Sequence, residues 1–230
     1  LSNLAKKNNC IYLTGYMKRH DKSVKKFAKK LKNLDFGDLK YVYYEHFSGD
    51  SYGKQVNYFK SRSLSQIKKT TLNKKFTNKK NNYLKFLNTH CHTINLIRFL
   101  IGDFSLKENA LNKYGEGNII FKKNKIEIIL KNKYQKSKKW HENVSFFFEQ
   151  GVAILKLIKP FLKESSDFKI IDFTEKKVIK NIKGKSWAFQ NQINFFVSLL
   201  KENKKKKVEQ YFSTDSSKDI AIIEKIFKVS

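Results

Sequence analysis

Short apolar segments separated by polar breaks occupy residues 117–158 and restrict the fold more than any other feature. Each is rich in Ile, Val, Leu or Phe, the composition typical of β-strands. The segments are residues 117–123, 126–130, 144–148 and 152–157. Gln150 and Gly151 indicate a tight hairpin between the last two. Because strands that follow one another through short turns pair antiparallel, we predict a mainly antiparallel sheet here.

Segments with helical periodicity flank these strands and do not alternate with them. Asp21 is a suitable N-cap for a helix through about residue 34, whose apolar stripe is Val24, Phe27, Ala28 and Leu31. Further helices are predicted near residues 2–8, 82–101, 186–201 and 215–228, and further strands over 11–15, 39–47, 169–173 and 177–179. The polar residues 61–80 are predicted to be a connection before the second of these helices. This order predicts an α+β fold over residues 1–230, one broad, mainly antiparallel sheet with helices packed on one face.

Composition narrows the class of protein. The formal net charge is +29, but the lysines are spread along the chain, and only three arginines occur among 230 residues. Arginine is favoured for phosphate and base recognition, so we expect no specific nucleic-acid partner. No run of 18 apolar residues is present, so we expect no membrane span. Cys10 and Cys91 are isolated, which favours a reducing compartment, the cytoplasm by default.

One predicted helix carries a polar stripe on an apolar body. At about 100° per residue, Asn88, His92 and Asn95 share one face. A histidine between two amides can take a proton from a bound hydroxyl, so His92 is a candidate acid/base, although taken alone it also fits a satisfied buried histidine. His90, Cys91 and His92 are not a zinc site, since adjacent helical side chains diverge; we expect no metal.

Three other groups of residues have two interpretations each. Arg19 is either a pocket residue or the salt-bridge partner of Asp21 or Asp50. Residues 45–46 either reach a substrate or lie at the rim of the site without a function, and we favour the rim. Residues 140–142 either touch the pocket or cap the sheet.

The chain resembles the Gfo/Idh/MocA oxidoreductases in the order and spacing of several motifs. Residues 9–21, NCIYLTGYMKRHD, are similar to the family's G-[FY]-x-x-R-[FY]-D segment, with His20 in place of the aromatic. Asn88-x-x-x-His92-x-x-Asn95-x-x-Arg98-Phe99-x-x-Gly102 is similar to its [DN]-x-x-x-H-x-x-D-x-x-x-[WFY]-x-x-G helix. Later landmarks are Trp140-His-Glu142, Phe146-Phe-Phe-Glu-Gln-Gly151, Phe189-x-x-Gln192-x-x-x-Phe196 and Asp219-x-x-x-Ile223-Glu224.

The resemblance implies a particular place for the cofactor. Family members have an N-terminal dinucleotide-binding domain followed by an α/β domain that shapes the substrate pocket, and this chain matches the second part. No G-x-G-x-x-G motif follows a strand, and the family's E-K-P motif does not occur. We therefore expect NAD or NADP to be bound mainly by a preceding domain, of which residues 1–10 are the tail.

The resemblance also implies roles for named residues. His92 would be the general acid/base for a carbinol of a sugar, cyclitol or related polyol, while the nicotinamide exchanges the hydride. Asn88 and Asn95 would orient the substrate, although Asn95 stands where many members have Asp. Met17, Lys18 and Arg19 would border the substrate pocket. The sheet would join copies of the chain into a homo-oligomer.

A different class of function stays open from sequence alone. The charge of +29 and the amide at Asn95 also suit a non-catalytic protein, either a sugar-binding scaffold or a polyanion binder.

Overall fold

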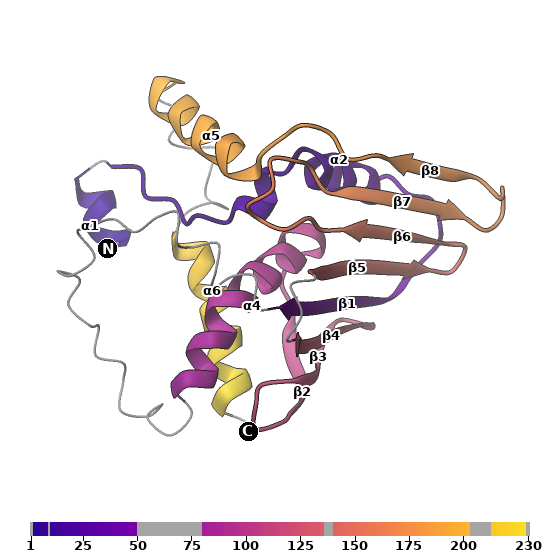
Figure 1. The fold of residues 1–230 in the computed structure, drawn as a ribbon, viewed down its shortest axis with the longest axis horizontal. Coiled ribbons are helices and arrows are strands. Elements are labelled where there is room, and N and C mark those ends of the chain that lie inside the picture. Colours follow the sequence, from indigo (N-terminus) through magenta and orange to yellow (C-terminus); the bar gives the residue numbers. More distant parts are fainter. Residues whose placement is uncertain (1, 9, 50–79, 136–139, 203–212, 229–230) are drawn as a thin grey trace.

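The structure is a computed structural model that describes residues 2–8, 10–49, 80–135, 140–202 and 213–228. Eight strands form one sheet in the order β2-β3-β4-β1-β5-β6-β7-β8 (Figure 1). The strands are β1 (Leu39–Gly49), β2 (Ser105–Leu111), β3 (Gly117–Lys123), β4 (Ile126–Gln135), β5 (His141–Phe148), β6 (Gly151–Lys156), β7 (Asp167–Asp172) and β8 (Val178–Asn181). The helices are α1 (Ser2–Lys7), η1 (Met17–His20), α2 (Lys22–Leu31), α4 (Lys80–Ile101), α5 (Ala188–Glu202) and α6 (Ser213–Lys228).

The sheet confirms the predicted architecture and adds one exception to its antiparallel order. β1 lies between β4 and β5, and it pairs with β5 antiparallel but with β4 parallel. All other neighbouring strands are antiparallel, including the hairpin from β5 to β6 at Gln150 and Gly151. Because β1 comes first in the sequence yet sits centrally, the later strands build the sheet outward on both of its sides.

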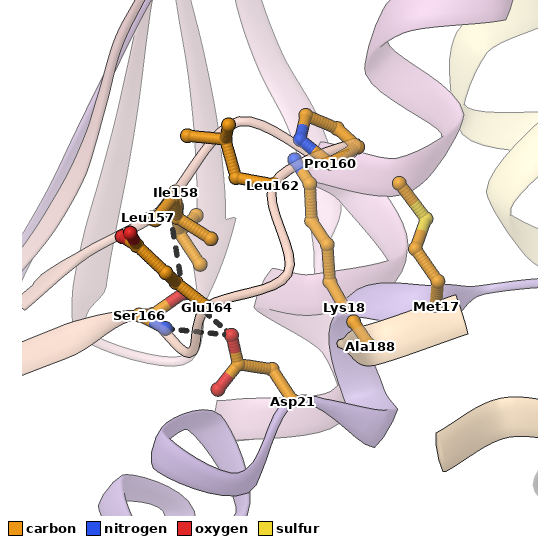
Figure 2. Close-up of a pocket in the computed structure, with 10 residues that line it drawn as sticks. All are labelled: Met17, Lys18, Asp21, Leu157, Ile158, Pro160, Leu162, Glu164, Ser166 and Ala188. Carbon is orange, nitrogen blue, oxygen red and sulfur yellow. Dashed lines mark hydrogen bonds between the residues drawn. The ribbon is translucent and has the colours of Figure 1, made fainter. Parts of the chain in front are cut away.

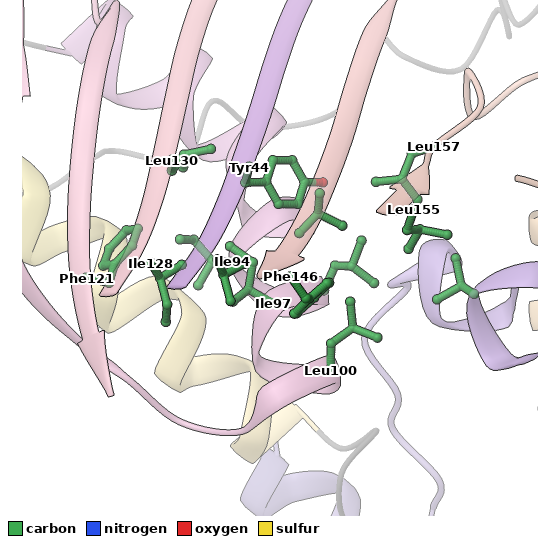
Figure 3. Packing of buried hydrophobic residues seen from close by; sticks show 14 of the residues in the cluster. Tyr44, Ile94, Ile97, Leu100, Phe121, Ile128, Leu130, Phe146, Leu155 and Leu157 are labelled. Carbon is green, nitrogen blue, oxygen red and sulfur yellow. The ribbon is translucent and has the colours of Figure 1, made fainter. Parts of the chain in front are cut away.

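Alternating side chains divide the sheet into a buried and an open face. Along β5, Glu142, Val144 and Phe146 point into the interior, and the residues between them are partly exposed. The core that results lies between this face and helices α2, α4 and α6, as Figure 3 shows for α4 and the central strands. The helices therefore cover one face of the sheet, as predicted.

Helix α2 begins where the sequence indicated. The Asp21 carboxylate accepts hydrogen bonds from the backbone N–H groups of Ser23 at 2.7 Å and Val24 at 3.3 Å, so it satisfies two otherwise unpaired donors. Its second oxygen accepts from the backbone N–H and the hydroxyl of Ser166, each at 2.8 Å. Asp21 thus caps the helix and ties it to the loop before β7. The predicted stripe of Val24, Phe27, Ala28 and Leu31 is buried.

Helix α4 lies between the sheet and helix α6. Its inner side buries Phe86, Ile94 and Ile97 completely. On the α6 side, the Phe227 ring contacts Tyr83 and Phe86 edge-on, with ring centroids 5.4 Å apart in both cases. Packing on both sides stabilises the 22-residue helix α4, because helices in proteins owe most of their stability to tertiary contacts.

Two predictions about the elements were wrong and one lies outside the described residues. Residues 11–15 form no strand; they run irregularly into η1. Strand β2 was not predicted, because its polar sequence SLKENAL lacks the apolar alternation of the other strands. The connection predicted over residues 61–80 lies outside the described residues, apart from Lys80. Among the described helices, none combines the length and apolar character that crossing a membrane requires.

Candidate functional site

His92 projects from α4 toward the segment that leads into η1. Its ring meets the Tyr16 ring edge-on, with centroids 5.6 Å apart and an interplanar angle of 86°. The side chain is partly buried, and its Nδ1 atom has no hydrogen-bond partner among the described residues. Burial lowers the pKa of His92 to about 4; the ammonium of Lys18 acts in the same direction, and the carboxylate of Glu142 opposes it. The imidazole is therefore neutral at physiological pH and able to accept a proton.

Lys18 places a cation close to this imidazole. Its Nζ atom forms a buried ion pair with an oxygen of Glu142 on β5. The same oxygen accepts a hydrogen bond from the hydroxyl of Tyr44 on β1 at 2.5 Å. All three side chains belong to the interior, with relative exposures of 8%, 1% and 0% for Lys18, Glu142 and Tyr44. Of the two interpretations of residues 140–142, the one in which Glu142 reaches the site agrees with this geometry.

Met17 and Lys18 also line a small cavity beside η1, shown in Figure 2. The cavity measures about 20 Å³, the space of roughly one water molecule. Its other walls come from Asp21 and from the loop between β6 and β7, including Pro160. In Figure 2 the Lys18 side chain runs from η1 toward Pro160. His92 is not among the residues that line this cavity.

Asn95 and Arg19 face helix α6 and not the His92 ring. The Asn95 side chain is 1% exposed, and its Nδ2 atom donates to Asp219 at 2.7 Å. The Arg19 guanidinium donates to the Asn95 carbonyl at 3.4 Å and lies 3.6 Å from a carboxylate oxygen of Asp215. Arg19 therefore pairs with Asp215. Of the two acids predicted as its partner, Asp21 caps α2 instead, and Asp50 lies outside the described residues. The structure does not bring these two predicted site residues together with the imidazole.

Arg98 is the centre of the network that fixes α6 on α4. It donates to Asp219 at 2.8 Å, to Asp215 at 2.7 Å and to Asp103 at 2.9 Å. These carboxylates hold Arg98 charged by raising its pKa against the opposing effect of burial. The Arg98-Phe99 part of the sequence motif thus has a structural role here.

Asn88 lies exposed on α4, one turn before His92. The predicted stripe therefore meets three surroundings: solvent at Asn88, the Tyr16 ring at His92 and helix α6 at Asn95. A helical wheel places the three side chains on one face of the helix. It cannot show which other element packs against each turn of that face.

A buried aromatic cluster lies deeper beneath α4. His46 on β1 is 1% exposed, and its ring meets those of His90 and Trp140 edge-on at centroid distances of 5.0 Å. Burial lowers the pKa values of His46 and His90 well below the usual range. The rim position favoured for His46 was wrong. β1 continues to Gly49, and the period of two that buries Tyr44 buries His46 as well.

A second cavity, of about 270 Å³, lies on the other side of η1. It is formed by Leu13, Thr14, His20 and Gln192 together with Ile193, Phe195 and Phe196 of α5. The His20 ring lies 5.0 Å from that of Phe195, and burial is the main cause that lowers the pKa of His20 to about 4. A mostly apolar hollow with a neutral imidazole is suited to a flat or apolar group.

The described residues contain no group of three or more His, Cys, Asp or Glu side chains that could hold a metal ion. What the arrangement offers is a buried cation, Lys18, and a neutral imidazole, His92, supplied by two different elements. Such a pair can hold an oxygen atom and exchange its proton.

Comparisons with known proteins agree with the fold. No protein-family model matches the sequence, and no curated protein matches it significantly. Among solved structures, the dehydrogenase MviM from Clostridium difficile is similar over 99% of this chain and 65% of the MviM chain, with a TM-score of 0.67 and 13% sequence identity. The 3-ketoreductase KijD10 from Actinomadura kijaniata, solved with NADP and TDP-benzene, matches over 98% and 64%, with a TM-score of 0.68 and 10% identity.

The match extends over nearly all of this chain but only about two thirds of each neighbour. At 10–13% identity it concerns the fold alone. One neighbour is a dehydrogenase and the other a 3-ketoreductase, and the resemblance seen in the sequence is confirmed at the level of the fold. The chain has the α+β fold of the C-terminal part of these enzymes.

Proposed function

We propose that the chain is the substrate-binding and oligomerisation part of an NAD(P)-dependent oxidoreductase. The enzyme would transfer a hydride between the nicotinamide and a carbinol carbon of a sugar, cyclitol or related polyol. The observation that carries the proposal is the neutral imidazole of His92 next to the ammonium of Lys18, on a fold shared with oxidoreductases. That KijD10, a 3-ketoreductase, was solved with NADP supports the cofactor and a reaction between a carbinol and a ketone.

The described residues do not fit the dinucleotide itself. Among them, no strand leads through a glycine-rich turn into the N-terminus of a helix, the arrangement that cradles a pyrophosphate. We therefore propose that NAD or NADP is held mainly by another domain, and that residues 1–10 are the tail of that domain.

The chain's own part in the reaction is the handling of the hydroxyl proton. His92 would accept this proton in oxidation and return it in reduction. Lys18 would hold the same oxygen and stabilise the negative charge that develops on it. Met17 borders the cavity beside Lys18, and Asn88 is one turn from His92, so both stay candidates for substrate contact.

We assign Asn95 and Arg19 an indirect part in substrate binding. Both are nearly fully buried, and both hold α4 against α6 through Asp219 and Asp215. They would fix the position of α4, and with it the position of His92, and would not touch the substrate.

The open face of the sheet supports a homo-oligomer. Tyr41 is 40% exposed on this face and stacks on Phe147, with centroids 4.3 Å apart. Partly exposed Tyr43, Ile129 and Ile154 extend the apolar area across neighbouring strands. An apolar sheet face of this kind is suited to a second copy of the same surface. We also propose a cytoplasmic location, because Cys10 and Cys91 are both free.

The test is turnover by the full-length protein. A panel of sugars, cyclitols and polyols is incubated with NAD and with NADP, and nicotinamide absorbance is followed. We expect reduction of one of the two cofactors with at least one polyol. If no carbinol substrate is turned over and neither dinucleotide binds to the full-length protein, the proposal is wrong.

A further inference from the structure

The ion pair between Lys18 and Glu142 is unusual because both charges are almost completely removed from water. Their side chains are 9% and 0% exposed. Burying such a pair costs more free energy than a hydrophobic pair of the same size would, so stability alone does not explain it. The carboxylate is also anchored by the Tyr44 hydroxyl at 2.5 Å, and its Oε2 atom has no hydrogen-bond partner among the described residues.

Both partners of the ion pair neighbour residues that contact the His92 part of α4. Lys18 lies two residues after Tyr16, whose ring meets that of His92, and Glu142 pairs in register with His46, whose ring meets that of His90. Lys18 from η1 and Glu142 from β5 are the charged groups that act on this imidazole, in opposite directions. Two more titratable groups lie near it: His46, directly across from Glu142 on β1, and Tyr16, whose ring meets the imidazole edge-on. On the α6 side, Asp219 is engaged by the guanidinium and amide described above. The charge next to His92 is therefore set by where the Lys18 ammonium lies.

Glu142 is what keeps that ammonium in place. Lys18 has a flexible stem, and it lines the small cavity that leads toward Pro160. Without a carboxylate partner, a buried ammonium either loses its proton or moves toward water. Glu142 itself cannot move easily, because it belongs to a central strand and accepts the Tyr44 hydroxyl.

We propose that Glu142 is a positioning residue that holds the Lys18 ammonium in one fixed place near the His92 ring. The assignment rests on the proposed function for its purpose, but its geometry is tested in the chain alone. Glu142 acts through Lys18 and does not touch the substrate.

The experiment is an NMR titration of the His92 ring in the full 230-residue chain, with the resonance identified by its loss in His92→Gln. Lys18→Met removes the nearby cation, so we expect the pKa of His92 to rise. Lys40→Met is the matched control, because Lys40 forms an exposed ion pair with Glu149 elsewhere on the sheet. The control should leave the His92 titration unchanged. An unchanged titration in Lys18→Met overturns the proposal.

Glu142→Gln then separates positioning from looser packing. In the otherwise wild-type chain it releases Lys18, so the pKa of His92 should rise. In the Lys18→Met background no ammonium is left to position, and removing the carboxylate should lower the pKa of His92. Looser packing would rehydrate the ring and raise the pKa in both backgrounds. A change of the same sign in both backgrounds therefore overturns the proposal.

A charge-retaining variant covers the case in which Glu142→Gln alone does not fold. Glu142→Asp keeps the carboxylate but withdraws it by one methylene from Lys18. We expect it to raise the pKa of His92 in the otherwise wild-type chain and to leave it almost unchanged in the Lys18→Met background. An equal effect in the two backgrounds overturns the proposal. Because no readout uses substrate or cofactor, these results are independent of whether the full-length protein turns over polyols.

Discussion

Lys18 and Glu142, 124 residues apart in the sequence, form a buried ion pair that joins η1 to the central strand β5. This contact holds the segment before α2 against the sheet, next to the helix that carries His92. It also brings a charged side chain of each partner to the candidate site. The stability of the fold and the electrostatics of the site therefore depend on the same two residues.

The ion pair leads to a prediction about stability. Removing either partner, by Lys18→Met or Glu142→Gln, leaves an uncompensated buried charge and should lower the free energy of unfolding by about 3–5 kcal/mol. The double variant removes both charges, so it should be more stable than either single variant. Denaturant unfolding of the four proteins measures this coupling. Additive losses would mean that the two side chains do not interact.

A second prediction concerns the amide at Asn95. Its Nδ2 atom donates to Asp219 at 2.7 Å in the interior. Asn95→Asp replaces this donor by a second buried carboxylate and should cost about 1–3 kcal/mol of unfolding free energy near neutral pH, because a hydrogen bond is replaced by repulsion. Asn88→Asp on the exposed part of the same helix is the control, expected within about 0.5 kcal/mol of wild type.

Acidification should diminish the loss caused by Asn95→Asp, because protonation of one carboxyl restores a donor between residues 95 and 219. Unfolding curves at neutral and mildly acidic pH measure this change. A loss that is the same at both pH values would mean that the carboxylates do not repel each other in the folded chain.

A third prediction concerns pH. Burial lowers the pKa values of His20 and His92 to about 4, and that of His46 falls well below its usual range. The unfolded chain, with histidine pKa values near 6.5, therefore binds protons first as the pH falls. Above about pH 6.5 these histidines do not change the free energy of unfolding. As the pH falls from 6.5 toward 4, each of them lowers it by up to about 1.4 kcal/mol per pH unit.

His46→Phe isolates one of these contributions. It keeps an aromatic ring against His90 and Trp140 but removes the titrating nitrogens. We expect a smaller loss of unfolding free energy between pH 6.5 and pH 4 than in wild type, measured by denaturant titrations across this range. The same pH dependence in both proteins would show that His46 does not remain neutral in the fold.

A fourth prediction concerns the open face of the sheet. Ile154→Lys places a charge on the same open face as Tyr43 and the Tyr41–Phe147 stack, so it should convert an oligomer into monomers. Ile182→Lys is the control, because Ile182 is 83% exposed in the segment after β8. Size-exclusion chromatography with light scattering measures the mass. If Ile154→Lys keeps the wild-type mass while wild type is oligomeric, the interface lies elsewhere.

Local patterns predicted most of the fold. The Asp21 cap, the apolar stripe of α2 and the hairpin at Gly151 each depend on residues close together in the sequence. The place of β1 does not, because its parallel pairing with β4 joins segments more than 80 residues apart. No periodicity indicates which strand will be its neighbour.

The sequence predicted only part of the candidate site, because the rest of the site also depends on contacts between distant segments. The helical spacing around His92 identified the imidazole, and the resemblance identified Lys18. The partner of Lys18 is Glu142, whose inward direction follows from the alternation along β5, but the pairing itself arises from tertiary packing. Likewise, the sequence could not show that the Asn95 amide binds Asp219, because helix α6, which supplies Asp219, is distant in the sequence. Asn95 was therefore assigned to the substrate.

The central claim is that the His92 imidazole exchanges the proton of a substrate hydroxyl. It is tested most directly by the rate of the chemical step in the full-length enzyme, measured for wild type and His92→Gln with the same polyol and saturating cofactor. The account predicts that kcat falls by about 10²–10⁴, while the free energy of unfolding changes little. A variant that turns over at the wild-type rate would contradict it.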